Sequence, residues 1–522
     1  MPTSLLNSGR KSIWRKKIAR IEFFHIPQTD WRPSLKWMGV IITGVSLGLF
    51  IIHSSSLSSQ WMPLISIAVM FPFILSIIQN TRKVLLALIL LDIPLQLDYY
   101  IGYEKETVGL GAIIGYGISI TTICLVILYG MWLSELLIKS RAGSKTSLKG
   151  SQPLILYLYL GFVSLSLFTA RNVTYSSYEL FMLIQIFLLY LYIVKTVRNR
   201  QDVLFIITML FISLILESMI MIFLLATGQS FSIAGISGRI NAGTVIPGQV
   251  SRIAGTLGSP NTAASYLSIL LAPSLSILKT NLARSYKLLG ALAFCLGTIG
   301  LISTFSRGGW IAYVISISLL VIVAWLNGRL TLKLPLTIIL VLTAAFLLFS
   351  STINERLTGN DMGSAYSRIP QYELAFRIIN DHPLLGIGAN NYGLVIKEYE
   401  QALSKDVFFW AVHNKYLLVW AETGIGGLLT FLFFIVTAIR YGWLTWKANH
   451  PFLSPIALGF SAAIIGQMAH MLFDVFHSRP QVQLLWVIAG LLLALNNILK
   501  EEKDGSRTDQ TAAWQYPQGK KE

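Results

Sequence analysis

The feature that most constrains this chain is a series of apolar runs, each about as long as a helix that crosses a bilayer. A hydrocarbon core about 30 Å thick needs about 20 apolar residues of α-helix, and lipid tolerates only backbones that satisfy their own hydrogen bonds. We therefore expect an all-α polytopic membrane protein with about 12–14 transmembrane helices. The runs fall at roughly 37–53, 61–79, 84–97, 110–135, 153–169, 177–194, 203–226, 261–278, 288–304, 309–326, 335–350, 414–438, 455–475 and 481–498.

Composition agrees with this class and excludes a soluble protein. Charged residues make up 12% of the 522 residues, and the mean hydropathy is +0.64, whereas a soluble domain has about 25% charged residues. The net charge of +17 would suggest nucleic acid in a soluble chain. Here the basic residues lie between apolar runs, so we expect membrane lipid and no nucleic acid as the partner. Cys124 and Cys295 lie inside apolar runs and predict neither a disulfide framework nor a zinc site.

The distribution of lysine and arginine indicates which ends face the cytoplasm. Most of the 41 basic residues fall in alternate connections, such as 139–149, while the connection 54–60 carries none. By the positive-inside rule, both termini are then cytoplasmic. We divide the chain into a basic cytoplasmic tail at 1–36, a transmembrane bundle at 37–499 and a disordered cytoplasmic tail at 500–522.

Two connections on the opposite side are too long to be simple turns. One covers about 227–260 and is rich in glycine, serine and proline. The other, 351–413, has the composition of a folded segment, and its stretch 366–381 has the apolar spacing of a helix. We therefore expect a large, partly helical extracytoplasmic loop before the third-last helix, of the kind that forms a lid or a binding loop.

Two arginines on the predicted outer face are candidates for anion binding. Arg252 begins the stretch RIAGTLGSPN, and Arg307 lies within TFSRGGW. Both have glycine and other small neighbours, which let a ligand approach the backbone closely. Two guanidiniums suit a diphosphate because each binds phosphate oxygens in a bidentate manner. The alternative for each arginine is an anchor at the membrane interface.

A histidine lies where the large loop re-enters the membrane. His413 begins HNKYLLVWAETGIGG, and a histidine titrates near neutral pH, so it could accept a proton from a sugar hydroxyl. A purely structural role is the alternative. Within the large loop, Arg368 and Arg377 either bind an anionic substrate or are solvated, and solvation is the plainer interpretation.

Other ionisable residues lie in the last spans. His470, Asp474 and His477 follow one another at helical spacing and could in principle bind a metal ion. The plainer interpretation is a polar seam that faces the interior of the bundle. Glu422, which must face protein or water because lipid would not accept its charge, lies deeper than His413 and is interpreted as structural.

Four short motifs follow one another between about residues 250 and 430. The motifs are RIAGTLGSPN at 252–261, SRGGW at 306–310, HPLLGIGANNY at 382–392, and HN at 413–414 followed by Gly424 and Gly427. In this order and spacing they resemble the O-antigen ligase / O-antigen polymerase superfamily, which comprises bacterial polysaccharide ligase and polymerase membrane proteins.

The resemblance implies a membrane glycosyltransferase at the outer face of the bacterial inner (plasma) membrane. It would transfer or polymerise glycan from an undecaprenyl-diphosphate-linked donor, in O-antigen or exopolysaccharide and capsule biosynthesis. Arg252 and Arg307 would hold the donor pyrophosphate, and His413 would activate or orient the acceptor hydroxyl. The family inverts the anomeric carbon and uses neither a metal nor another cofactor. Further candidate substrate contacts are Asn261, Arg368 and Asn414.

The resemblance leaves the acceptor open. A ligase would use a lipid A–core acceptor, a polymerase would use another lipid-linked glycan, and either could contact other polysaccharide assembly proteins. The expected span count exceeds the twelve that are usual for these ligases. The alternative from another class is a lipid-linked oligosaccharide flippase or other transporter, but transporters usually show internal repeats and ionisable residues at the midplane. We find no clear repeat, and the candidate residues lie at the outer ends of spans.

Overall fold

The computed structural model describes most of the chain beyond residue 80. The chain divides into two compact units, Met1–Thr81 and Arg82–Glu522, and the description below concerns the second. The expected basic tail at 1–36, the spans at 37–53 and 61–79 and, apart from Leu340, the span at 335–350 lie outside the described residues. The described residues are 80–103, 112–141, 154–233, 236–241, 251–328, 340, 368–400 and 411–514.

The described part of the chain is built almost entirely from helices. Its first half contains α4 (Thr81–Leu95), α5 (Ile120–Arg141), α6 (Leu154–Leu165) with the 3₁₀ helix η3 (Ser166–Thr169), α7 (Val173–Thr196) and α8 (Arg200–Thr227). Its second half contains α9 (Pro260–Ser276) with the 3₁₀ helix η4 (Ile277–Lys279), α10 (Arg284–Ser303), α11 (Arg307–Leu326), α13 (Arg368–Asp381), α14 (Tyr392–Glu400), α15 (Lys415–Lys447), α16 (Leu453–His470) and α17 (Arg479–Trp514).

Nine of the helices in the described residues are long and apolar enough to cross a membrane. Each expected span that falls within the described residues forms a helix, although α4 has 15 residues and α6 with η3 is also short. The all-α polytopic membrane fold is therefore confirmed. The helix expected at 366–381 is present as α13.

Two boundaries differ from the sequence-based expectation. The run at 110–135 becomes helical only at Ile120, because the four residues before it form strand β2 (Tyr116–Ser119), which pairs with β1 (Asp98–Ile101). At the other terminus, α17 continues to Trp514, where we expected disorder from residue 500. Its polar extension begins with Lys500, Glu501, Glu502 and Lys503, which are strong helix formers, and it propagates from a helix already nucleated.

The core is organised around α9. Every residue of α9 except Asn261 is buried, and the helix contacts α8, α10, α11, α16 and α17. Small residues let the backbones approach closely, as in other membrane bundles. A side chain at Gly309 of α11 would collide with Ala264, and one at Gly459 of α16 would collide with Ser276. Helix α9 is therefore held from several sides.

The connection at 227–260, which is too long to be a simple turn, contains a small antiparallel sheet. Its strands are β3 (Phe231–Ile233), β4 (Ile236–Asn241) and β5 (Arg252–Gly255), with β4 in the middle. Asn241 pairs with Arg252, and β5 packs on α8 and α9. The sheet therefore places Arg252 directly before the start of α9.

Helix α15 is kinked at Gly424, where φ is 70°. A side chain there would be strained and would collide with the backbone of the large loop. The kink exposes backbone groups that the loop satisfies: the N–H of Ile387 donates to the carbonyl of Ala421 at 2.9 Å. In return, the N–H of Ile425 donates to the carbonyl of Pro383 at 3.0 Å. The loop is thus anchored to the helix that begins just after His413.

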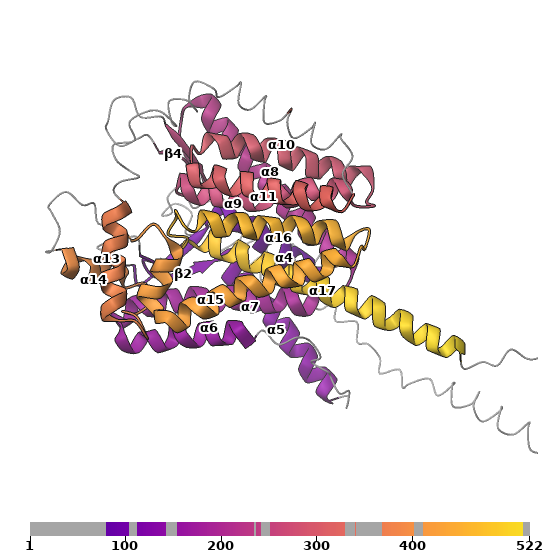
Figure 1. Cartoon of the computed structure of the whole chain (residues 1–522), viewed down its shortest axis with the longest axis horizontal. Coiled ribbons are helices and arrows are strands. Elements are labelled where there is room, and N and C mark those ends of the chain that lie inside the picture. Colours follow the sequence, from indigo (N-terminus) through magenta and orange to yellow (C-terminus); the bar gives the residue numbers. More distant parts are fainter. Residues whose placement is uncertain are drawn as a thin grey trace, which may run out of the picture. The chain divides into compact units, whose positions relative to one another are not determined.

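The connections between helices gather at two ends of the bundle. Figure 1 shows α13, α14 and β4 at one end of the long helices and the last turns of α17 at the other. The end that holds 252–261, 304–307 and 411–415 is called the site end. The other is called the basic end, and its described lysines and arginines include Lys195, Arg198, Arg200, Lys279, Arg284, Lys287, Lys447, Lys500 and Lys503.

Candidate active site

Arg252 and the turn before Arg307 are joined by hydrogen bonds. Nε of Arg252 donates to the carbonyl of Thr304 at 3.0 Å, and Nη2 donates to Oδ1 of Asn261 at 2.8 Å. The hydroxyl of Ser306 donates to the same Oδ1 at 3.0 Å. The two arginine motifs, which lie some 50 residues apart in the sequence, therefore form one unit. We call Arg252, Asn261, Thr304, Ser306 and Arg307 the arginine cluster.

The start of α11 adds to the positive potential of the arginine cluster. Ser306 is the N-cap of α11, and its hydroxyl accepts from the N–H of Gly309 at 3.4 Å. Arg307 is the first residue of this helix. A helix N-terminus favours anions through its unpaired N–H groups and its dipole. The cluster therefore combines the guanidinium of Arg252 with a helix N-terminus that begins at Arg307.

A buried glutamate that the sequence interpretation missed fixes the segment after Arg252. Glu217 of α8 is 1% exposed. One of its carboxylate oxygens accepts from the N–H of Thr256 at 2.8 Å, and the other accepts from the hydroxyl of Thr256 at 2.5 Å. A side chain at Gly255 would collide with this carboxylate. An ionisable residue inside the apolar run 203–226 was the signal that could have revealed it.

His413 is held by Gln371 of α13. Oε1 of Gln371 lies 3.2 Å from both the backbone N and the Nδ1 of His413. A backbone N–H can only donate, so the atom facing it must be the amide oxygen. The oxygen then accepts from Nδ1–H as well, which leaves Nε2 as the nitrogen with the lone pair. The geometry therefore gives His413 the tautomer that a general base needs at Nε2.

The pKa of His413 is lowered from the ordinary value of 6.5. Burial is the largest cause, and Arg368 acts in the same direction, whereas Asp474 and the carbonyl of Ala411 raise the pKa. Burial disfavours the charged imidazolium. His413 is therefore neutral near pH 7 and able to accept a proton.

The segment His470–Asp474 connects the arginine cluster to the large loop. Gly308, the residue after Arg307, packs closely against this segment. A Cβ atom at its position would lie 2.8 Å from Cδ2 of His470 and 3.6 Å from Cβ of Phe473. The guanidinium of Arg368 lies over the Phe473 ring, 5.8 Å from its centroid. This segment, which we call the bridging segment, was not recognised from the sequence.

The bridging segment also contacts the beginning of α15. The carbonyl of Met471 accepts from the N–H of Lys415 at 2.8 Å, and Leu472 accepts from the hydroxyl of Tyr372 at 3.1 Å. Asn414 caps α15, since its side-chain oxygen accepts from the next two N–H groups that follow Lys415. The bridging segment thereby fixes the position of His413 relative to Arg307. Asn414 contributes to this position because it caps the start of α15.

The metal hypothesis for His470, Asp474 and His477 is not supported by the geometry. Helix α16 ends at His470, so the three residues do not share a helical face as their spacing suggested. Asp474 accepts from Nε2 of Gln481 at 2.6 Å. Within the described ranges, no group of three or more His, Cys, Asp or Glu residues is placed to hold a metal ion. Arg377 is exposed, in agreement with the solvated interpretation.

Comparison with known protein families gives a match. Residues 291–432 match a protein family described as O-antigen ligase. Arg307 and His413 lie inside the matched region, and Arg252 lies before it but bonds to Thr304 within it. No curated protein matches the chain. The family match supports the resemblance that the motifs indicated: this multi-pass membrane protein contains a region similar to the O-antigen ligase family.

Proposed function

We propose that this protein transfers or polymerises a glycan from an undecaprenyl-diphosphate-linked donor during the synthesis of O-antigen or another surface polysaccharide. The family match supports a membrane glycosyltransferase of the ligase or polymerase type. The arginine cluster is the observation that carries the donor assignment, because Arg252 is locked to the turn that begins with Thr304 and leads into Arg307. We assign the site end to the extracytoplasmic side and both termini to the cytoplasm, in line with the charge of the basic end.

The donor diphosphate binds at the arginine cluster. Its oxygens accept hydrogen bonds from the guanidiniums of Arg252 and Arg307, and the helix N-terminus adds N–H groups. When the bond between the anomeric carbon and the diphosphate oxygen breaks, negative charge grows on the leaving diphosphate. Fixed cations stabilise that charge more in the transition state than in the ground state.

The acceptor hydroxyl is activated by His413. Nε2 takes the hydroxyl proton while the oxygen forms a bond to the anomeric carbon, and the electron pair of the broken C–O bond leaves with the diphosphate. A single displacement of this kind inverts the anomeric carbon and requires no metal. Gln371 holds the ring through Nδ1 at 3.2 Å and so keeps Nε2 available.

The experiment is a transfer assay on purified protein with an undecaprenyl-diphosphate-linked oligosaccharide, repeated in producing cells. Arg252→Ala, Arg307→Ala and His413→Ala should each abolish most of the transfer and should leave lipid-linked donor unconsumed. Arg377→Ala is the matched control, because it removes an exposed arginine from α13 and should keep full activity. If the three site variants fold and transfer glycan at the wild-type rate, the site assignment is wrong.

The same assay in cells separates a ligase from a polymerase. Loss of a ligase leaves long glycan on the carrier lipid, whereas loss of a polymerase leaves single repeats attached to the final acceptor. A flippase would give a third result, in which donor accumulates on the cytoplasmic leaflet and purified protein shows no transfer.

A further inference from the structure

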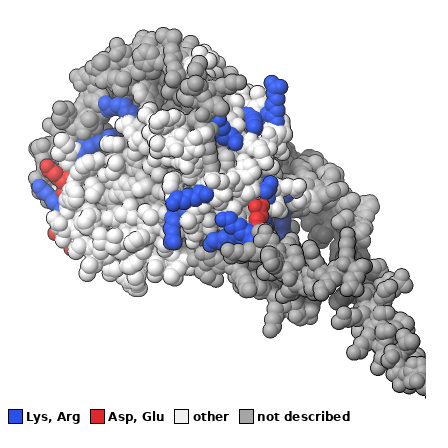
Figure 2. All heavy atoms as spheres, turned by 45° about the vertical axis from the view of Figure 1, so that its right-hand side comes forward, with Lys and Arg blue, Asp and Glu red and all other residues white. Residues whose placement is uncertain are grey.

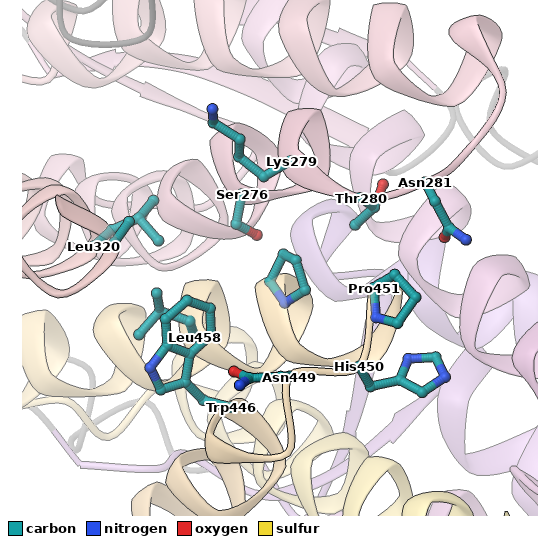
Figure 3. A pocket seen from close by; sticks show the side chains of 12 residues that line it. Ser276, Lys279, Thr280, Asn281, Leu320, Trp446, Asn449, His450, Pro451 and Leu458 are labelled. Carbon is teal, nitrogen blue, oxygen red and sulfur yellow. The ribbon is translucent and has the colours of Figure 1, made fainter. Parts of the chain in front are cut away.

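A cavity lies at the basic end, on the opposite side of the bundle from the arginine cluster. It has a volume of about 590 Å³ and lies between the ends of α9 and α11 and the turn from α15 to α16. Figure 3 shows the side chains that line it. The residues used for the proposed reaction do not line this cavity, so it requires a separate explanation.

The lining of this basic-end cavity is divided into an apolar and a polar side. Figure 3 shows Leu320, Leu458 and Trp446 on one side, and Asn281 and His450 on the other. A ligand that fits such a lining has a hydrocarbon part and a polar head. The cavity lies where membrane-spanning helices end, which is the depth of lipid headgroups. Together these features fit a phospholipid better than a soluble metabolite.

The charge around the cavity favours an anionic headgroup. Lys279 lines the cavity, and in Figure 3 its side chain extends away from the other labelled side chains. A lysine head on a flexible stem suits a phosphate at the mouth of a cavity. Figure 2, which brings forward the part of the molecule with the last turns of α17, shows more Lys and Arg than Asp and Glu. Clustered cations at this depth attract anionic lipids.

His450 has a structural role on the polar side of the cavity. Its Nδ1 accepts from the N–H groups of Phe452 and Leu453 at 3.1 and 2.9 Å, which orders the start of α16. Burial and the neighbouring Arg200 lower its pKa, against a smaller effect of Glu502. Its Nε2 lies 2.7 Å from Nη2 of Arg200, so both ring nitrogens already have partners. The ring therefore gives the cavity its shape, and the positive charge comes from Lys279.

We propose that this cavity binds an anionic phospholipid from the leaflet at the basic end. The headgroup phosphate lies between Lys279 and Asn281, and an acyl chain follows Leu320, Ala324 and Trp446. The lipid would hold α9 and α11 against the α15–α16 turn. This proposal is independent of the donor chemistry at the site end.

Binding is tested on protein purified in mild detergent and stripped of lipid. Phosphatidylglycerol, phosphatidylcholine with the same acyl chains, and glycerol phosphate are added separately, and thermal unfolding and native mass spectrometry are measured. Phosphatidylglycerol should be retained as one tightly bound lipid and should raise the unfolding temperature most. Glycerol phosphate should have no effect, and an equal effect of glycerol phosphate would overturn the lipid assignment.

Three variants locate the binding. Lys279→Gln should weaken phosphatidylglycerol binding about fivefold and leave phosphatidylcholine unchanged. Ala324→Trp fills the apolar side and should block both lipids. Arg284→Gln is the matched control, because this exposed arginine lies at the same end and outside the lining. If Lys279→Gln binds phosphatidylglycerol with wild-type affinity, the proposal is wrong. The result for Lys279→Gln is sufficient by itself if Ala324→Trp does not fold.

Discussion

Arg252 and Asn261 are joined by a hydrogen bond of 2.8 Å from Nη2 of the arginine to Oδ1 of the asparagine. Asn261 is also the one residue of α9 that is not fully buried. Its oxygen accepts a second hydrogen bond, from Ser306 at 3.0 Å. A neutral side chain thus ties β5, α9 and the start of α11 together.

Replacing Asn261 by alanine should reduce transfer without unfolding the protein. Loss of the oxygen frees Arg252 to rotate away, so we expect kcat/KM for the lipid-linked donor to fall about ten- to a hundredfold. The measurement is transfer at varied donor concentration. Asn327→Ala, at the exposed end of α11, is the control and should behave as wild type. Unchanged kinetics in Asn261→Ala would show that the asparagine does not position Arg252.

Glu217→Ala should lower stability and activity together. The change leaves the buried N–H of Thr256 without its acceptor, which costs about 1–3 kcal/mol, and it loosens the segment after Arg252. Thermal unfolding and transfer rate should both report the loss. Gln201→Ala, an exposed change on the same helix, should alter neither. If Glu217→Ala lowers the unfolding temperature but keeps the wild-type transfer rate, Glu217 has a role in folding alone.

The transfer rate should fall at acid pH as His413 becomes protonated. Burial lowers the pKa of His413 below its usual 6.5, so the neutral base persists to a lower pH than for an exposed histidine. We therefore expect full activity at pH 7 and a decline below about 6.5. A Gln371→Leu variant should shift the midpoint of the decline, because the ring loses its partner at Nδ1. A profile that is flat from pH 5 to 8 would contradict proton transfer to His413.

Stability should also decrease at acid pH, and His477 should account for much of the change. Burial, followed by the nearby Lys415, lowers the pKa of His477 to about 4. Because the unfolded chain binds this proton more readily, stability is complete above about pH 6.5 and falls as the pH drops towards 4. His477→Asn should flatten the dependence of the unfolding temperature on pH. An unaltered slope would assign the effect to other groups.

Gly424→Ala should detach the large loop from α15. Alanine at φ 70° and ψ −177°, a region that is essentially restricted to glycine, costs about 1–3 kcal/mol, and its Cβ would collide with the loop backbone. We expect faster proteolysis within 383–388 and reduced transfer. Gly161→Ala provides the comparison, since a Cβ at that helical position meets nothing within 4 Å. Equal proteolysis of the two variants would show that the kink does not anchor the loop.

The spans were predictable because a helix that crosses lipid is apolar along its length. Helix α13 was predictable because the apolar residues of 366–381 recur at helical spacing. The sheet at 231–255 was not predicted, because its glycine- and serine-rich strands have weak local preference and form through pairing with one another. The bridging segment was missed for a different reason. His470 and Asp474 were placed on one helix, and only tertiary packing shows that α16 ends between them. Contacts such as that between Gly308 and His470 join distant parts of the sequence and leave no local pattern.

The burial of α9 has a consequence for how the enzyme cycles. A helix enclosed along nearly its whole length cannot tilt or slide without opening the core, so Asn261 and its bonded arginine constitute a preorganised frame. In the proposed function, the carrier lipid would then enter and leave past a stationary arginine cluster. Any conformational change that the proposed reaction requires would then fall on the acceptor side, where His413 is held by Gln371 of α13.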